Sequence, residues 1–422
     1  MNTPVKPNMA VKPLFPNPFR PGAGHQPPYL AGRKYEEKEF RRLLEQTIIM
    51  ENAILTGLRG VGKTVLLESL KPIAIQEEWL WVGTDLSESA SISEAHLATR
   101  LLTDLALVTR DIPVASNVQT GAGFTSRPTT QAVTLSFEHL FAIYNQTPGL
   151  IADKIKAVFL YVAPFIKNSG RHGIIFAYDE AQNMSDHAPK NEFPLSILLD
   201  VFQSIQRQGI PFMLLLAGLP TLFPKLVAAR TYAERMFRVL FLKQLTEDES
   251  RQAITRPVSD AHCPVRFNDQ AITLITNHSG GYPYFIQFMC REAYDSWLQK
   301  TATGKVPSVP VSEIIRKLDN DFFAGRWARV TDRQQQLLYV IAQLENANDE
   351  FTIQDILERS EIELNKPFGR SQINQMLATL ITAGLIYKDR HGKYLFAVPL
   401  LAHFINRTMT DQIAANDDPD PI

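Results

Sequence analysis

The sequence has little cysteine, almost no net charge and no long apolar run. Its cysteines, Cys263 and Cys290, lie too far apart for the paired spacing of a disulfide framework or a zinc site. A formal net charge of -1 excludes a global attraction to nucleic acid, so any such contact must be local. No apolar run reaches the roughly 18 residues that cross a bilayer, and the N-terminus lacks the layout of a secretory signal. We therefore expect a cytoplasmic protein with no membrane partner.

The chain is long enough for more than one folded unit. Its 422 residues suit two or three domains, and 45% hydrophobic with 21% charged residues is typical of a globular protein. Residues 1–28 are rich in proline and are expected to form a flexible, solvated segment, although residues 17–28 could instead lie across a binding site. The last residues, 411–422, are acidic and are expected to be disordered.

The strongest motif matches the phosphate-binding loop G-x-x-x-x-G-K-[ST]. A short apolar run, 53–56, precedes the motif, and a helix-compatible run, 65–70, follows it, which is the order that this loop requires. Glycines let main-chain N–H groups wrap a polyphosphate, a lysine adds positive charge, and a threonine hydroxyl ligates Mg²⁺. The motif predicts ATP and Mg²⁺ as ligands, held by Gly57, Leu58, Arg59, Gly60, Val61, Gly62, Lys63, Thr64 and Val65.

A second apolar run, 173–178, ends in the adjacent carboxylates Asp179 and Glu180. Parallel strands deliver their carboxyl ends to one sheet edge, so this pair should meet the phosphate loop in space. We expect Asp179 to hold Mg²⁺ together with Thr64, and Glu180 to polarise the water that attacks the γ-phosphate. Lys63, Asp179 and Glu180 are the candidate catalytic residues within the site.

Two further features bear on hydrolysis. Residues 211–218 predict another buried strand, but it ends in Ala217-Gly218, which leaves Thr221 as a weak candidate for a polar sensor of the γ-phosphate. The segment 230–238 is rich in arginine. Arg235 is the candidate for an arginine finger that one subunit presents to the nucleotide of its neighbour, although surface charge is the simpler interpretation. This would require an ATP-dependent homo-oligomer or a partner protein.

The remainder of the chain predicts helices followed by a hairpin. Thr246 and the acids after it begin a helical region that extends to about residue 299. Three helices are then expected, at 332–344, 353–359 and 371–382, followed by a hairpin over 385–398, which is the order of a winged helix. Basic residues on this unit could contact the phosphates of double-stranded DNA, and a protein-contact role is equally compatible; these residues are Arg370, Lys388, Arg390 and Lys393.

Taken in order, these motifs resemble the AAA+ ATPases, in the branch shared by origin-recognition-like initiators and STAND signalling ATPases. Leu30-Ala31-Gly32-Arg33-x-x-Glu36 is similar to the element that opens STAND modules, with Lys34 in place of its first glutamate, and Gly281-Tyr282-Pro283 is similar to their G-x-P lid element. The resemblance implies nucleotide contacts from Arg33 and Pro283. Initiator lids usually bring an arginine to the nucleotide where Pro283 stands, and this departure, with Gly218, favours slow hydrolysis.

The expected fold class is therefore α/β: a P-loop parallel sheet with a helical lid, followed by an α+β winged helix. The expected division is an ATPase core at 29–244, a lid at 245–305 and a winged-helix domain at 306–410. The leading hypothesis is an ATP-driven molecular switch. The alternatives are a DNA-binding regulator or scaffold that holds ATP without cleaving it, and a small-molecule kinase, which lacks an acceptor-site pattern.

Overall fold

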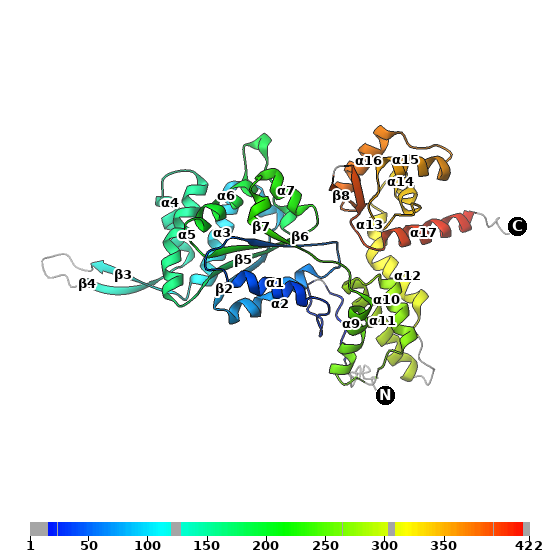
Figure 1. The fold of residues 1–422 in the computed structure, drawn as a ribbon, viewed down its shortest axis with the longest axis horizontal. Coiled ribbons are helices and arrows are strands. Elements are labelled where there is room, and N and C mark those ends of the chain that lie inside the picture. Colours follow the sequence, from blue (N-terminus) through cyan, green and yellow to red (C-terminus); the bar gives the residue numbers. More distant parts are fainter. Residues whose placement is uncertain are drawn as a thin grey trace, which may run out of the picture.

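The computed structural model describes residues 16–22, 24–119, 128–263, 265–302, 309–390 and 392–416. A sheet domain occupies one end of the longest axis and a helical body the other, with a narrow junction between them (Figure 1). The nucleotide motifs belong to the sheet domain, whereas the predicted lid and winged helix belong to the helical body.

The sheet domain is built on a five-stranded parallel sheet with the order β2-β5-β6-β1-β7. Strand β6 lies between β1 and β5, so the two strands that carry the nucleotide motifs flank a common neighbour. The near-continuous apolar sequences of the central strands fit a sheet that is covered on both faces. The strands are β1 (Asn52–Thr56), β2 (Trp79–Asp85), β5 (Gly173–Asp179), β6 (Phe212–Gly218) and β7 (Phe237–Phe241).

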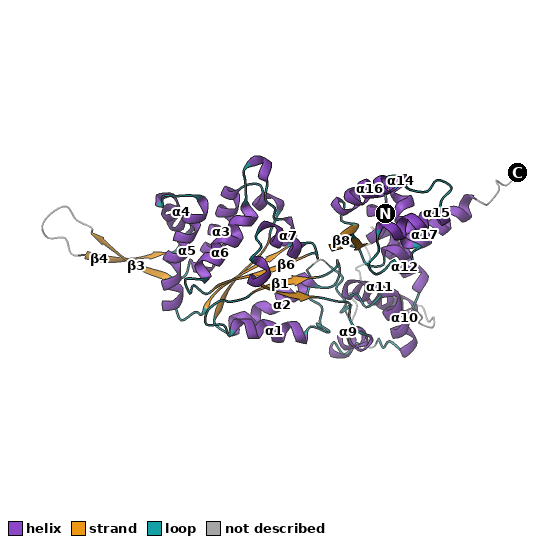
Figure 2. Ribbon diagram, turned by 45° about the horizontal axis from the view of Figure 1, so that its top comes forward, coloured by secondary structure: helices purple, strands orange, loops and turns teal. Residues whose placement is uncertain are grey.

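Side-chain alternation divides the interior of this domain into two cores. Ile174, Phe176 and Tyr178 of β5 pack into one core, while Ile175 and Ala177 pack into the other. The first core lies under α3 to α8 and the second under α1 and α2, which cover the opposite faces (Figure 2). The helices are α1 (Lys34–Leu44), α2 (Lys63–Gln76), α3 (Glu94–Thr109), α4 (Phe137–Gln146), α5 (Ile151–Asn168), α6 (Pro194–Gln206), α7 (Leu222–Ala229) and α8 (Ala233–Met236).

The segment between α3 and α4, from which composition suggests a long loop, is a β-hairpin instead. Strands β3 (Pro113–Gln119) and β4 (Pro128–Thr134) pair antiparallel, and the hairpin projects from the end of the sheet domain (Figure 1). Its composition, rich in serine, threonine and glycine, gives no clear alternation of apolar and polar residues that would mark the two strands.

The helical body contains the lid and the terminal domain. The lid consists of α9 (Glu247–Asp260), α10 (Asp269–Ser279) and α11 (Pro283–Ala302). A connecting segment follows, made of α12 (Val311–Leu318), a π-helical turn (Asp319–Ala324) and α13 (Gly325–Trp327). The terminal domain then presents three helices, a hairpin and a last helix: α14 (Asp332–Ala342), α15 (Ile353–Glu363), α16 (Arg370–Thr382), β8 (Ile386–Arg390), β9 (Lys393–Phe396) and α17 (Leu401–Asn416).

One continuous apolar core runs through the whole helical body. Phe285 of the lid stacks on Phe323 of the π-turn with ring centroids 6.1 Å apart, and Phe323 stacks on Phe404 of α17 at 5.2 Å. All three rings are 4% exposed or less. The boundary that the sequence predicts between residues 305 and 306 therefore falls between two units that have one hydrophobic core in common.

At the N-terminal end of the described chain, the alternative that residues 17–28 lie across a binding site agrees with the structure, because Arg20, His25 and Pro27 line the cavity described below. Residues 16–28 are not a solvated tail, because Phe19 is 2% exposed within the lid core and Asn17 donates to the carbonyl oxygen of Arg291 and the carboxylate of Asp295. Residues 411–416 continue α17 rather than forming a disordered tail. Residues 1–15 and 417–422 lie outside the described part. Within that part, no helix is long and apolar enough to cross a membrane.

Candidate nucleotide site

The phosphate loop connects β1 to α2, and its glycines occupy positions that a side chain would obstruct. Gly62 is the N-cap of α2 with φ 93°, a left-handed conformation that L side chains rarely adopt. A β-carbon at Gly57 would lie 2.5 Å from the carbonyl oxygen of Leu242. The loop therefore takes the shape that the motif predicts, with the N-terminus of α2 directed at its centre.

Lys63 is held at the centre of this loop. Its ammonium donates to the carbonyl oxygens of Gly57 and Leu58, each at 3.0 Å. Burial lowers the pKa of Lys63 to about 8, the nearby carboxylates of Glu180 and Asp179 oppose that shift, and Arg59 adds to it. A phosphate group that approached the ammonium would restore the stability of its charged form.

Asp179 and Thr64 meet although 115 positions separate them. The Thr64 hydroxyl donates to one Asp179 carboxylate oxygen at 2.5 Å, and the Glu180 N–H donates to the other at 2.8 Å. One hydroxyl and one carboxylate fit Mg²⁺, which keeps several waters and completes its shell with substrate phosphates. Among the described residues, no cluster of three or more histidine, cysteine or acidic side chains forms an all-protein metal cage.

Glu180 follows β5 with φ 49°, in the left-handed region, and its side chain lines the cavity described below. The Gln182 amide donates to the Glu180 carboxylate, and its oxygen accepts from the Leu219 N–H at 3.1 Å. A β-carbon at Gly218 would lie 2.6 Å from that amide oxygen. Gln182 thus packs at the end of β6, where the sequence has a glycine instead of a polar residue. Only its position two residues after Glu180 could have indicated from the sequence that it lies near the site.

A cavity of about 280 Å³ lies between the phosphate loop, the N-terminal segment 20–33 and the lid. The lid approaches the loop directly, because the Tyr284 N–H at the start of α11 donates to the carbonyl oxygen of Gly60 at 3.1 Å. Glu180 is the carboxylate among the lining residues, and the lining cations are Arg20, Arg33, Arg59, Lys63 and Arg326. This excess of positive charge suits a polyanionic ligand.

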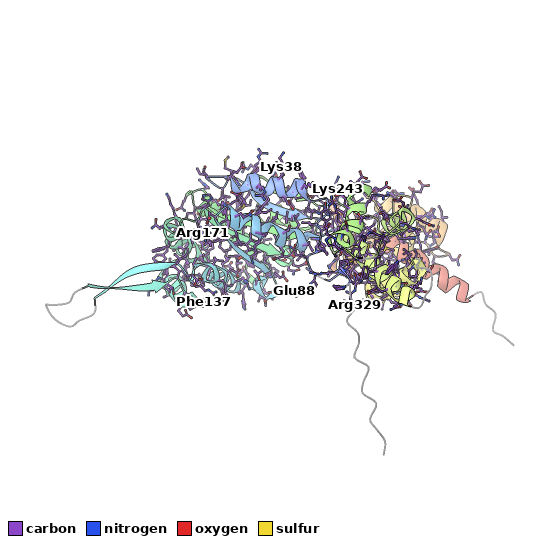
Figure 3. All side chains as sticks on the ribbon, turned by 90° about the horizontal axis from the view of Figure 1, so that it is seen from below. Lys38, Glu88, Phe137, Arg171, Lys243 and Arg329 are labelled. Carbon is purple, nitrogen blue, oxygen red and sulfur yellow. The ribbon has the colours of Figure 1, made fainter. Side chains whose placement is uncertain are left out.

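Arg33 braces the phosphate loop from the N-terminal side. Its guanidinium donates to the carbonyl oxygens of Val61 at 2.8 Å and Lys243 at 3.0 Å, and it lies 3.8 Å from the Glu36 carboxylate. Burial lowers its pKa, while Glu36 and Glu249 oppose the shift. Lys243 marks the junction between the two bodies (Figure 3), so Arg33 connects the loop to the point where the lid begins.

Most of the residues that the sequence predicts to bind the nucleotide lie at the cavity, and others lie away from it. Arg59 through Val65 line the cavity, as do Arg33 and Pro283, whereas Gly57 and Leu58 contribute carbonyl oxygens to Lys63. Thr221, at the N-cap of α7, is not part of the lining. Arg235 is exposed on α8, outside the cavity.

The predicted DNA contacts lie on the terminal domain. Arg370 and Lys388 are exposed, and Lys393 is half-buried. The side chain of Arg390 and the whole of His391 lie outside the described residues.

Sequence reasoning missed Arg326, Phe322 and Tyr284 as cavity residues. Tyr284 follows Pro283 directly and could have been inferred from the lid motif. Arg326 and Phe322 carry no sequence signal, because they reach the cavity from the connecting segment, more than 250 residues after the phosphate loop.

Comparisons with known proteins give one match to the terminal domain and several matches that cover most of the chain. A family model described as a domain of unknown function (DUF8462) matches residues 320–405. No curated protein matches the chain. Solved structures that are similar include the Walker-type ATPase PABY2304 of Pyrococcus abyssi, at 15% identity and a TM-score of 0.56 over 89% of this chain and 96% of that one. The Aeropyrum pernix ORC2 protein in its ADP form is 13% identical, with a TM-score of 0.53 over 93% and 98%.

Proposed function

We propose that this chain, which has the fold of the origin-recognition-like AAA+ ATPases, is an ATP-driven molecular switch that hydrolyses ATP slowly. The observation that carries the proposal is that Lys63, Thr64 and Glu180 line one cavity, that Asp179 is hydrogen bonded to Thr64, and that the lid reaches this cavity through Tyr284. A triphosphate in this cavity would contact both bodies of the molecule at once.

Each site residue has a role that its position supports. The N–H groups of the loop and the Lys63 ammonium bind the β- and γ-phosphates. Thr64 and Asp179 would hold Mg²⁺, which neutralises the phosphate charge when it is bound. Glu180 orients the attacking water and accepts its proton. Arg33 keeps the loop in the shape that binds phosphate by holding the carbonyl oxygen of Val61.

Two features of the site favour slow turnover. Gly218 supplies no side chain at the end of β6 that could contact the γ-phosphate, and Gln182, which packs against Gly218, does not line the cavity. The Glu180 carboxylate is already engaged by Gln182, so activating a water requires that hydrogen bond to be shared or broken. The same features support the second candidate, a regulator that binds ATP without cleaving it. Tight ATP binding by the full chain without any turnover would favour that candidate.

The proposal is tested by measuring ATP binding, phosphate release and particle size on the full chain with Mg²⁺. A switch requires that ATP bind one conformation better than another, because a ligand shifts an equilibrium only through this difference in affinity. We expect ATP and ADP to give different hydrodynamic sizes. Absence of ATP binding at millimolar concentration would overturn the proposal.

Arg235 is proposed to act on the nucleotide of a neighbouring subunit. Among the arginines at 230, 235 and 238, the other two form ion pairs with Asp200 and with Glu39 and Glu51, whereas Arg235 has no ion pair within the described chain. A guanidinium that faces the transferred phosphoryl group stabilises its charge, so Arg235→Ala should lower ATP turnover by about tenfold or more. Turnover by assembled protein is the measurement.

Mixing experiments separate this role from a structural one. A Lys63→Ala subunit cannot bind ATP but still presents Arg235, so adding it to Arg235→Ala subunits should restore part of the turnover. Arg207→Ala, at the exposed end of α6, is the matched control and should behave as wild type. Normal hydrolysis by Arg235→Ala alone would reject the assignment.

The terminal domain is proposed to be a winged helix that serves as the output of the switch and contacts double-stranded DNA. Helix α16 buries Ile373, Met376, Leu377 and Leu380. After Arg370, its exposed side carries no charged residue and presents the amides of Gln372, Asn374 and Gln375, which can read base edges. Arg370 lies at its N-terminus, where phosphate contacts are common.

DNA binding is expected to weaken as salt rises, because cations on the protein displace the counterions of the phosphates. Arg370→Ala and Lys393→Ala should each weaken binding and reduce the steepness of the salt dependence by about one in a double-logarithmic plot. Lys38→Ala, on the exposed surface of α1 (Figure 3), is the control. Binding that neither terminal-domain variant alters would exclude this surface.

A further inference from the structure

The segment that connects the lid to the terminal domain also forms part of the nucleotide cavity. Phe322 in its π-helical turn and Arg326 in α13 both line the cavity. π-Helical turns are uncommon and occur often at functional sites, where they redirect side chains that a regular helix would point elsewhere. Phe322 and Arg326 both lie within 320–405, the part of the chain that the domain model of unknown function matches.

The orientation of Arg326 is set by neighbours from the same segment and from the lid. Its guanidinium lies over the Phe322 ring, 4.3 Å from the centroid, and donates to the Phe322 carbonyl oxygen. The Phe322 ring packs against Tyr284 at 5.3 Å and Phe285 at 5.1 Å between centroids. Because Tyr284 is hydrogen bonded to Gly60, Arg326 is positioned relative to the phosphate loop through a single intervening pair of rings.

A second guanidinium approaches from the opposite side of the cavity. Arg59 belongs to the phosphate loop, where its charge acts on the pKa of Lys63 alongside the charges of Glu180 and Asp179. It lines the same cavity as Lys63 and Glu180. A β-carbon at Gly384, between α16 and β8, would lie 3.4 Å from the Arg59 guanidinium. The loop thus touches the terminal domain through Arg59.

The charge of Arg59 disfavours the charged form of Arg326, and no carboxylate pairs with either guanidinium in the described part of the chain. Burial lowers the pKa of Arg326 most, Arg59 and Arg329 lower it further, and Tyr284 opposes the shift. Neither Arg59 nor Arg326 forms an ion pair with a carboxylate in the part of the chain that the structure describes. Two partly buried cations that face a common cavity are stabilised by an anion between them.

We infer that Arg59 and Arg326 together bind the terminal phosphate of ATP, and that this shared contact holds the terminal domain against the sheet domain. The inference rests on the proposed function, because it assigns regulation to the same site. Arg326 would supply, from the connecting segment, the cation that Pro283 cannot supply from the lid. The output domain would then respond directly to whether ATP or ADP is bound, because its own connecting segment contacts the terminal phosphate.

The packing around Arg326 extends this contact to the end of the chain. Phe322 meets Phe323 with centroids 4.9 Å apart, and Phe323 stacks on Phe404 of α17 at 5.2 Å. The Asp319 carboxylate at the start of the π-turn forms an ion pair with Arg407 of α17 at 2.6 Å. A displacement of Arg326 by the phosphate would therefore be transmitted to α17 through packed side chains.

The test compares ATP and ADP affinities of the full chain, with Mg²⁺, by calorimetry. A charge-assisted hydrogen bond to the terminal phosphate exists only with ATP, so Arg326→Ala should weaken ATP binding by about tenfold or more while changing ADP binding by less than about threefold. Arg326→Lys keeps the charge and should recover part of the ATP preference. The matched control is Arg316→Ala, because Arg316 is exposed on α12 of the same segment and does not line the cavity.

Amide hydrogen exchange provides a readout that a purely structural arginine would not alter. In wild type, ATP but not ADP should slow exchange in the turn around Gly384, and this protection should disappear in Arg326→Ala and in Arg59→Ala. If wild type binds ATP but Arg326→Ala and Arg326→Lys keep its ATP-to-ADP preference and its protection, the inference is wrong while the switch proposal stands. If wild type fails to bind ATP at all, both are wrong.

Discussion

Lys63→Ala is expected to reduce ATP affinity by about 100-fold or more, because it removes an ammonium that makes charge-assisted contacts to two phosphates in a partly buried site. The residue is suited to this role by its location, since its hydrogen bonds to Gly57 and Leu58 place it at the centre of the loop. Equilibrium binding of ATP with Mg²⁺, followed by a change in protein fluorescence or by calorimetry, measures the effect.

The control for this variant lies on the same helix. Lys71 is exposed two turns further along α2, so Lys71→Ala changes the net charge equally but should leave ATP affinity as in wild type. Equal affinities for wild type and Lys63→Ala would mean that the loop does not bind the phosphates, and the proposed function would fail with it.

Glu180→Gln is expected to bind ATP as tightly as wild type and to lower its turnover by about 100-fold or more. Glutamine has the shape of glutamate but cannot accept a proton from the attacking water, and a positioned general base contributes at least this factor. ATP binding should persist because the contacts of Lys63 and of the loop are unchanged. Phosphate release under saturating ATP, together with the affinity, separates the two effects.

Glu88→Gln tests whether the loss of a carboxylate on this domain is enough to slow hydrolysis. Glu88 is exposed on the surface of the sheet domain (Figure 3) and does not line the cavity. Its substitution should leave turnover unchanged. Wild-type turnover in Glu180→Gln would instead show that another group activates the water.

The core of the site was predictable because its chemistry is encoded in short segments. The phosphate loop needs glycines at fixed spacing, and Asp179 follows an apolar strand that can only be buried in a sheet. Parallel strands bring their ends together, so the meeting of Thr64 and Asp179 follows from the pattern without a structure. The capping residue Thr246 was predictable for the same local reason, and it forms a capping box with Glu249.

The rest of the site depends on contacts between distant segments. Phe19 anchors residues that composition presents as a flexible tail, because a proline-rich segment needs no regular structure to pack against a lid. Arg326 reaches the cavity only after the whole lid has been formed, and a lone arginine in a charged stretch has no periodicity to mark it. The hairpin of β3 and β4 escaped prediction because the sequences of its strands show no clear alternation of apolar and polar residues.

The single core of the helical body has a mechanical consequence. Because Phe285, Phe323 and Phe404 stack in series, the lid cannot tilt relative to the terminal domain without breaking apolar contacts, so the two should turn as one lever. This rigid unit would rotate about the junction near Lys243, and the nucleotide would bind close to that junction. A small angular change at the phosphates would therefore sweep the far end of the molecule through a much longer arc, without requiring any element within the lever to deform.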